Sequence, residues 1–352
     1  MTRSRLVVLG STVVVAAGAM AALGALYLDP ARAAVGPLPP QALSLPAGTR
    51  YVMGLDVKRF VASPLYTKYA AARTANRPQA FAELEEKTGL NPERDLDQVY
   101  IAGTQAGVPG RGGDALVVVT GRFDRAKVAR AIETERKGVT SKNVSGTVVY
   151  LFDENSAGKG TGATAFLDDN TLVMGTQASV EQTVVARAKG EAPLRDNAAL
   201  LALLEGVKPG STFWMVGDKT LLSNMPKAIP GPGGPGTSQS IELPALKSLM
   251  VTGDLEPQVT LDITGETADE PAAKNLADVV RGFVALASLQ ANQKPELKQL
   301  ASAISVTTEA SRVHIAARVP YEVLDSLQPQ THGGGRGLQP GRAATTPPPS
   351  AQ

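Results

Sequence analysis

The sequence contains no cysteine and only two histidines among its 352 residues. Without cysteine the chain can form no disulfide, no thiolate metal or iron–sulfur site, no cysteine nucleophile and no lipid-modified cysteine. His314 lies in a strand-like run and His332 in a low-complexity stretch, so we expect no multi-histidine metal site. These absences leave carboxylates as the main candidates for catalysis or metal binding, and we expect no cofactor.

Aromatic residues and net charge are also scarce. Only 4% of residues are aromatic, Trp214 is the single tryptophan, and the formal net charge is +2. The excess of basic residues lies at the two ends of the chain, and the body between them is slightly acidic. A body without a basic patch or aromatic platforms lacks the features of a nucleic-acid-binding protein, so we expect no nucleic acid as a partner.

A long hydrophobic run follows Arg3 and Arg5. Residues 6–28 carry no charge, and as a helix they would reach about 34 Å, enough to cross a hydrocarbon core of about 30 Å. We predict that residues 1–33 are an N-terminal membrane anchor with the arginines in the cytoplasm. The alternative is a signal segment cleaved near Ala33, in an Ala-x-Ala pattern. Both outcomes place the body outside the cytoplasmic membrane.

The body alternates short strand-like runs with helical runs, which predicts an α+β fold. The candidate strands are rich in Val, Tyr and Phe and are bounded by Gly, Asp or Asn. They cover residues 49–56, 98–104, 115–121, 146–154, 163–169 and 170–176. The candidate helices cover residues 77–89, 124–138, 178–190 and 197–206, each ending at a glycine.

The second half of the body repeats the order of the first. A shift of 162 residues aligns residues 47–64 with residues 209–226 without a gap, and its matches include Met53 with Met215 and Asp56 with Asp218. Later strand-like and helical runs recur in the same order. We predict an internal duplication that gives two related α+β lobes, residues 46–206 and 207–328, with antiparallel sheets and helices packed on one face.

Three segments are too rich in Pro, Gly or Ser to belong to a core. We predict that residues 34–45 form a Pro-rich spacer and that residues 227–240 form a flexible surface loop of the second lobe. Residues 329–352 have almost no large apolar side chain to offset the entropy of ordering and predict a disordered tail.

A glycine-rich loop, residues 153–163, matches G-x-G-x-x-A through Gly158, Gly160 and Ala163. This pattern binds dinucleotides only where a helix follows, because the helix N-terminus holds the pyrophosphate. Here the following run is strand-like. We predict that the loop joins two antiparallel strands and that Lys159 serves a turn instead of a phosphate site.

Two groups of acidic residues are candidates for chemistry. Asp56 and Asp218 occupy equivalent places in the two repeats, each before a helical run, where an N-cap is the favoured role and an acid/base pair is the alternative. The second group lies near the glycine-rich loop and consists of Asp153, Glu154, Asp168 and Asp169. It lacks the spacing of a 12-residue calcium loop, so solvated turns are favoured over a calcium site.

Arg312, His314 and Arg318 alternate with apolar residues, which places them on one face of a strand. An exposed strand face is the favoured interpretation, and an anion-binding surface is the alternative. The sequence contains no G-x-S-x-G motif, and His314 has arginines in place of an orienting acid nearby, so a serine hydrolase is not expected.

The run GFVALASLQA, which contains Phe283, Leu286 and Leu289, is nearly apolar on every side of a helix. Such a helix must be covered by a sheet, by the other lobe or by a ligand. We expect a sheet to cover it, and an apolar ligand or partner surface is the alternative.

Residues 43–68 contain Leu45-Pro46-Ala47, then a strand-like run, Asp56 and Ser63-Pro64. Together with the hydrophobic N-terminus and the closing VHIAARVPYEVLDSL, this pattern resembles a loose group of exported or membrane-anchored bacterial proteins of unknown function. The resemblance implies a location in the bacterial cell envelope and a repeated α+β body. It implies no activity and no functional residue.

These observations predict a non-catalytic cell-envelope protein that binds a partner protein or an apolar, lipid-like ligand. A carboxylate-dependent hydrolase or transferase is one alternative, and a structural spacer tethered to the membrane is another. We expect residues 6–28 to contact the membrane and the body to face the periplasmic or extracytoplasmic side.

Overall fold

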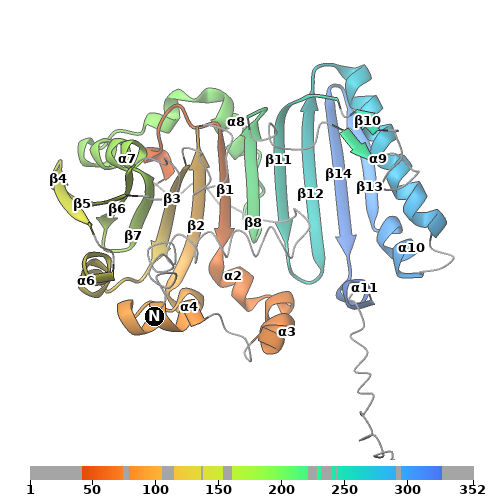
Figure 1. Cartoon of the computed structure of the whole chain (residues 1–352). Helices are drawn as coiled ribbons and strands as arrows, with labels where there is room; N and C mark the ends of the chain where they lie inside the picture. Colours follow the sequence, from red (N-terminus) through yellow and green to blue (C-terminus); the bar gives the residue numbers. More distant parts are fainter. Residues whose placement is uncertain are drawn as a thin grey trace, which may run out of the picture.

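The computed structural model describes residues 42–73, 79–104, 115–135, 138–153, 161–220, 228–230, 240–242, 244–290 and 295–326. Its strands are β1 (Tyr51–Asp56), β2 (Leu96–Gly103), β3 (Ala115–Gly121), β4 (Thr140–Val144), β5 (Thr147–Asp153), β6 (Thr161–Asp168), β7 (Thr171–Thr176), β8 (Phe213–Asp218), β9 (Ala228–Pro230), β10 (Ser240–Glu242), β11 (Leu246–Asp254), β12 (Val259–Thr267), β13 (Ile304–Glu309) and β14 (Arg312–Val319). Twelve of them form one antiparallel sheet in the order β13-β14-β12-β11-β8-β1-β2-β3-β7-β6-β5-β4 (Figure 1). The described chain is therefore an α+β body built on one large antiparallel sheet.

The helices lie in the connections between strands, except α11, which follows the last strand. They are α2 (Val57–Ala62), α3 (Pro64–Arg73), α4 (Gln79–Thr88), α5 (Pro92–Asp95), α6 (Arg125–Glu135), α7 (Gln177–Lys189), α8 (Ala198–Glu205), α9 (Glu270–Gln290), α10 (Pro295–Ser302) and α11 (Tyr321–Ser326), with 3-10 turns η1 (Ala42–Ser44) and η3 (Pro193–Asp196). Within the described ranges, no helix is both long enough and apolar enough to cross a membrane. The predicted span, residues 6–28, and the predicted tail, residues 329–352, lie outside those ranges.

The local signals of the first half are confirmed. Each candidate strand overlaps one of the strands β1, β2, β3, β5, β6 and β7, and each candidate helix overlaps α4, α6, α7 or α8. No pattern predicts β4, because its residues are polar and mostly exposed. It is held by pairing with β5 through a tight turn in which Ser145 and Gly146 both have positive φ, at 49° and 87°.

The two halves share one sheet, which corrects the expectation of separate sheets in two lobes. β1 pairs antiparallel with β8, so the sheet continues from residues of one predicted lobe into those of the other. The physical reason for the shared sheet is that β1 and β8 are the edge strands of the two halves. Without this pairing, β1 and β8 would each expose a row of unpaired backbone groups.

Helices cover both faces of the first half, which corrects the expectation of helices on one face only. In β3, Leu116 and Val118 join a core cluster with residues of α7 and α8. Val117 and Val119 point the other way and join a second cluster with residues of α2, α4 and α6. A continuous apolar run such as ALVVV is typical of a strand buried on both sides.

The strands are arranged symmetrically about the β1–β8 pair. Outward from β1 the order is β2, β3, β7 and β6, and outward from β8 it is β11, β12, β14 and β13. A helix follows the third strand in each half, α6 after β3 and α9 after β12. Met53 and Met215, which the 162-residue shift superimposes, lie opposite each other in the β1–β8 register. The five innermost strands of the two halves therefore have the same order, and the first half continues beyond them with β5 and β4.

Two predicted boundaries are adjusted. Residues 42–45, at the end of the predicted spacer, belong to the folded body, since they include η1 and the fully buried Leu45. The ends of the predicted loop 227–240 pair with each other, because β9 and β10 form a separate two-stranded sheet. Residues 231–239 lie outside the described ranges.

The Leu-Pro-Ala motif forms a hydrogen-bonded turn just before β1, which we call the clasp and which consists of residues 45–49 and Asn197. Leu45 is fully buried in the core beneath α7 and α8. The Pro46 carbonyl accepts hydrogen bonds from the Thr49 N–H at 3.0 Å and the Thr49 hydroxyl at 2.6 Å. Asn197 then donates its amide to the carbonyls of Ala47 (2.9 Å) and Thr49 (2.7 Å). The motif therefore fixes a turn.

Asn197→Ala is expected to lower the free energy of unfolding by about 1–2 kcal/mol. The substitution removes both clasp bonds, and it also removes the N-cap of α8, where the Asn197 side chain accepts the Leu200 N–H at 3.1 Å. Urea unfolding followed by circular dichroism measures the change. Asn143→Ala, which removes one bond in an exposed turn, is the matched control and should cost less. Equal losses would contradict a special role for the clasp.

Asp56 and Ser63-Pro64, the remaining motif residues, shape the connection after β1. Asp56 caps α2, and Ser63 is fully buried, donating its hydroxyl to the Phe60 carbonyl at 2.6 Å. The same hydroxyl accepts the Tyr66 N–H at 3.1 Å, while Pro64 begins α3. Proline suits the first position of a helix because its missing N–H has no partner there in any case. The whole motif is thus explained by turns and caps.

Candidate functional site

The two carboxylates of the acid/base alternative lie at opposite ends of the β1–β8 pair. Asp56 ends β1, whereas Asp218 ends β8 beside Arg50, which pairs with its carboxylate at 3.1 Å. The rise of the strands separates them by roughly 20 Å. Asp56 accepts the Arg59 N–H at 2.9 Å, which confirms its role as a cap. Asp218 accepts the Thr220 N–H at 2.8 Å, and the rest of the helical run predicted after it lies outside the described residues.

The acidic residues around the glycine-rich loop do not assemble either. Asp153 pairs with the first residue of β6, whereas Asp168 and Asp169 lie at the opposite end of that strand. Asp168 and Asp169 each bind an arginine side chain, at 3.4 Å and 2.7 Å. Glu154 lies outside the described residues. In the part of the chain that the structure describes, no three acidic or histidine side chains are grouped as metal ligands.

The glycine-rich loop joins two antiparallel strands, as predicted. β5 and β6 pair on either side of it, with Asp153 opposite Thr161. The segment that follows is strand β6, in which Ala163 is fully buried, so the helix that a dinucleotide site needs is not there. Lys159 lies outside the described residues.

A broad polar surface, which we call the polar face, lies on one side of the second half of the sheet. Alternate residues of β11, β12, β14 and β13 point to this side, because residues directly opposite in register share a face. Most of them are polar, namely Ser248, Thr252, Asp254, Thr260, Asp262, Thr264, Glu266, Ser305, Thr307, Glu309, Arg312, His314 and Arg318, and Met250 and Ala316 are the apolar members. The intervening residues point to the other side, where Val313 and Ala317 pack in cores with residues of α9 and α11.

Arg312, His314 and Arg318 lie together on the polar face, and each has an acidic neighbour. Arg318 Nη2 is 2.7 Å from Asp262 Oδ1, and His314 Nε2 is 3.9 Å from Glu309 Oε2. Arg312 stands in register with a glutamate on each neighbouring strand. Their placement on one face is confirmed. Anion binding stays a prediction, and the acidic neighbours make this surface better suited to a partner that carries both signs of charge.

Sequence reasoning missed these acidic neighbours. The signal was present in β12, VTLDITGET, where Thr260, Asp262, Thr264 and Glu266 alternate with apolar residues. The strand β14 alone gives no information on which strands will flank it. Thr264 Oγ1 also lies 3.1 Å from His314 Nδ1, so a β12 residue holds the imidazole.

The polar face lies on the same side of the sheet as the core under α7 and α8 in the first half. Thr252 lies directly opposite Trp214, which is 1% exposed and packs in the cluster that contains residues of α8. Along β12, β14 and β13, the described helices that pack on the strands do so on the other side, through the cores around Ala273 and Val323. The described structure therefore leaves the part of the polar face on β12, β14 and β13 without a helical cover (Figure 1), whereas Thr252 on β11 is buried.

The apolar helix predicted around Phe283 is α9. Its first part, which precedes the predicted run, packs on the sheet through Ala273 and Ala277, both 0% exposed. Cover of the run itself by a sheet stays a prediction. Phe283 is half-buried, and the side chains of Leu286 and Leu289 lie outside what the structure describes. An apolar ligand or partner surface at these three residues stays a prediction.

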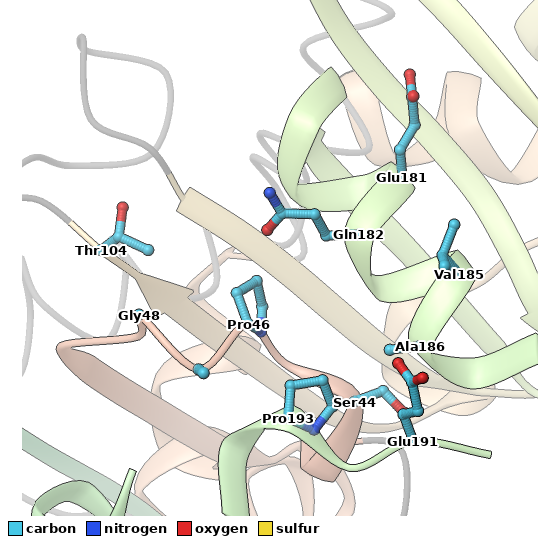
Figure 2. A pocket seen from close by; sticks show the side chains of 11 residues that line it. Ser44, Pro46, Gly48, Thr104, Glu181, Gln182, Val185, Ala186, Glu191 and Pro193 are labelled. Carbon is cyan, nitrogen blue, oxygen red and sulfur yellow. The ribbon is translucent and has the colours of Figure 1, made fainter. Parts of the chain in front are cut away.

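A surface hollow of about 680 Å³ lies between α7 and the chain that enters β1 (Figure 2). Pro46 and Gly48 line one side, and Glu181 of α7 and Glu191 line the other. Glu181 binds Lys142 of β4 at 2.7 Å, and this hydrogen bond lowers the pKa of the Glu181 carboxyl.

No protein-family model matches the sequence, and no curated protein matches it. The chain is similar to a solved structure titled "Structure of crystal form IV of TP0453", with a TM-score of 0.45 and 12% sequence identity over 81% of this chain and 94% of that chain. This likeness is too distant to carry an argument about fold or function.

Proposed function

We propose that this chain is a non-catalytic cell-envelope protein that binds a partner protein through the polar face. The observation that carries the proposal is the contrast between the two halves of one continuous sheet surface. Helices α7 and α8 cover it in the first half, whereas no described helix covers it over β12, β14 and β13. A flat surface with paired charges of both signs favours a polar protein surface over an apolar ligand.

Two further arguments support the non-catalytic character. The carboxylates of the enzyme alternative lie at separate ends of strands or bind arginines. The motif residues from Leu45 to Pro64 are accounted for by a clasp and helix caps.

The location rests on the N-terminal sequence. The uncharged run at residues 6–28 after two arginines supports an N-terminal membrane anchor with the body on the extracytoplasmic side. In this arrangement the Pro-rich residues before Ala42 separate the membrane from the sheet. The resemblance of residues 43–68 to exported bacterial proteins supports the same location.

An internal duplication is part of the proposal. Its support is the shared strand order of the two halves and the pairing of Met53 with Met215 across the join. In this proposal the two copies differ on one surface: the first copy is apolar there under α7 and α8, and the second has alternating polar residues in β12 and β14. The polar face is thus the feature that distinguishes the second copy.

Site-specific photocrosslinking of the full chain in its native membrane tests the proposed function. A benzophenone side chain at Thr264, in the centre of the polar face, is expected to give one discrete protein adduct. The same group at Arg130, exposed on α6, is the matched control and should give none. The Thr264 adduct should weaken when Arg318→Glu reverses a charge beside Asp262. Equal labelling at both positions, or none at Thr264, would favour the spacer alternative.

A further inference from the structure

Strand β13 forms one edge of the sheet, and its backbone groups alternate between β14 and the open side. The Arg318 N–H donates to the Ala303 carbonyl at 2.9 Å, so residue 303 directs its backbone toward β14. In an antiparallel pair the direction alternates from residue to residue. Ile304, Val306 and Thr308 therefore direct their N–H and C=O groups outward, where the described strands supply no neighbour.

An open edge of this kind is a template for another strand. Natural edges are commonly protected by lysine, proline or a bulge in the strand. β13 reads ISVTTE and has none of these, and it pairs with β14 in an unbroken register. Its protection must therefore come from a neighbouring element.

That element is α9, which lies beside β13 (Figure 1). Arg281 Nη2 donates to the outward carbonyl of Val306 at 3.0 Å. Arg281 Nη1 binds Asp278 Oδ1, one turn earlier in the same helix, at 2.8 Å. The guanidinium group is thus fixed across the middle of the open edge, at the carbonyl that a new strand would need.

We propose that Arg281 keeps the β13 edge closed to a second copy of this chain. A second copy can pair with this edge because Val306 lies at its middle and directs its backbone groups outward, so that it can face Val306 of a two-fold-related copy. Two antiparallel β13 strands centred on Val306 would satisfy the outward groups of both copies through an isologous contact. In that register Glu309 of one copy lies beyond Ile304 of the other, so the two glutamates do not oppose each other. Arg281 already donates to the Val306 carbonyl, which is the central hydrogen-bond acceptor of this pairing.

The test compares Arg281→Ala with the native full chain, both kept in the same detergent, by light scattering after size-exclusion chromatography. The protein mass of Arg281→Ala is expected to double with rising concentration, while the native mass stays constant. Arg312→Ala, which removes an exposed arginine from the adjacent strand β14, is the matched control and should behave as the native chain. Circular dichroism checks that each variant is folded, and Asp278→Ala, which only releases Arg281, should associate more weakly.

A second substitution identifies the edge that associates. Val306→Pro removes an outward N–H without breaking the pairing with β14, since proline is tolerated at such edge positions. Added to Arg281→Ala, it should restore the native mass. The proposal is overturned if Arg281→Ala keeps the native mass at every concentration, if its association survives Val306→Pro, or if the native chain already associates through β13.

Discussion

Gly54→Ala is expected to lower the free energy of unfolding by about 3 kcal/mol, because the new methyl group has no space. Gly54 lies opposite Trp214 in the β1–β8 register. A Cβ atom at Gly54 would stand 2.2 Å from Trp214 Nε1 and 2.4 Å from Cε2. The indole is 1% exposed and packed in the main core, so it cannot move aside without disturbing the cluster around it.

Urea unfolding, followed by Trp214 fluorescence and by circular dichroism, measures this loss. Gly282→Ala is the matched control: Gly282 lies inside α9, and a Cβ atom there would meet nothing within 4 Å. Alanine is a better helix former than glycine, so this control should gain up to about 1 kcal/mol. A Gly54→Ala variant as stable as the native chain would show that the indole does not lie flat on β1.

Asp95→Asn is expected to lower the free energy of unfolding by about 2 kcal/mol at neutral pH. Asp95 is 8% exposed, and its carboxylate accepts hydrogen bonds from Arg94 Nε (2.9 Å), Arg94 Nη2 (2.6 Å) and the Asn91 N–H (2.9 Å). The exposure of the Arg94 side chain, 58%, keeps the estimate below that of a fully buried pair. The amide of asparagine cannot accept all three bonds and carries no charge.

The same carboxylate makes stability depend on pH. The Arg94 hydrogen bond is the main cause that lowers the pKa of Asp95, with the Asn91 N–H contributing in the same direction. A carboxyl with a lowered folded-state pKa stabilises the fold above its unfolded pKa of about 3.9, and this stabilisation is lost as pH falls through the folded pKa. The free energy of unfolding of the native chain should therefore decrease when the pH drops under about 4. The free energy of unfolding of Asp95→Asn should decrease less steeply over the same pH range. Asp196→Asn, at an exposed position, is the control and should follow the native curve.

The parts of the fold that local sequence determines were predictable. The Asp56 cap, the glycine that ends α7 and the antiparallel strands around the glycine-rich loop each depend on a few adjacent residues. The covering of both faces was also readable from the run ALVVV in β3, although the expectation of helices on one face overlooked it.

The parts that depend on distant pairing were not predictable. Nothing in the residues of β1 indicates that β8 is its neighbour, and the shift that aligned Met53 with Met215 indicated similarity without contact. For the same reason the alternation in β14 placed Arg312, His314 and Arg318 on one face but could not supply Asp262 and Glu309. The charge of a sheet surface is set by neighbouring strands, whose order local patterns do not encode.

The pairing of β1 with β8 also sets an order of events while the chain is being made. β1 leaves the ribosome early and can pair with β2 as soon as that strand follows, but its other side has no strand to bind until residues 213–218 emerge. During this interval the strand that will occupy the middle of the finished sheet is an open edge. The nascent chain is therefore most vulnerable to misassembly before Phe213 appears, and a product that terminates earlier keeps that edge permanently.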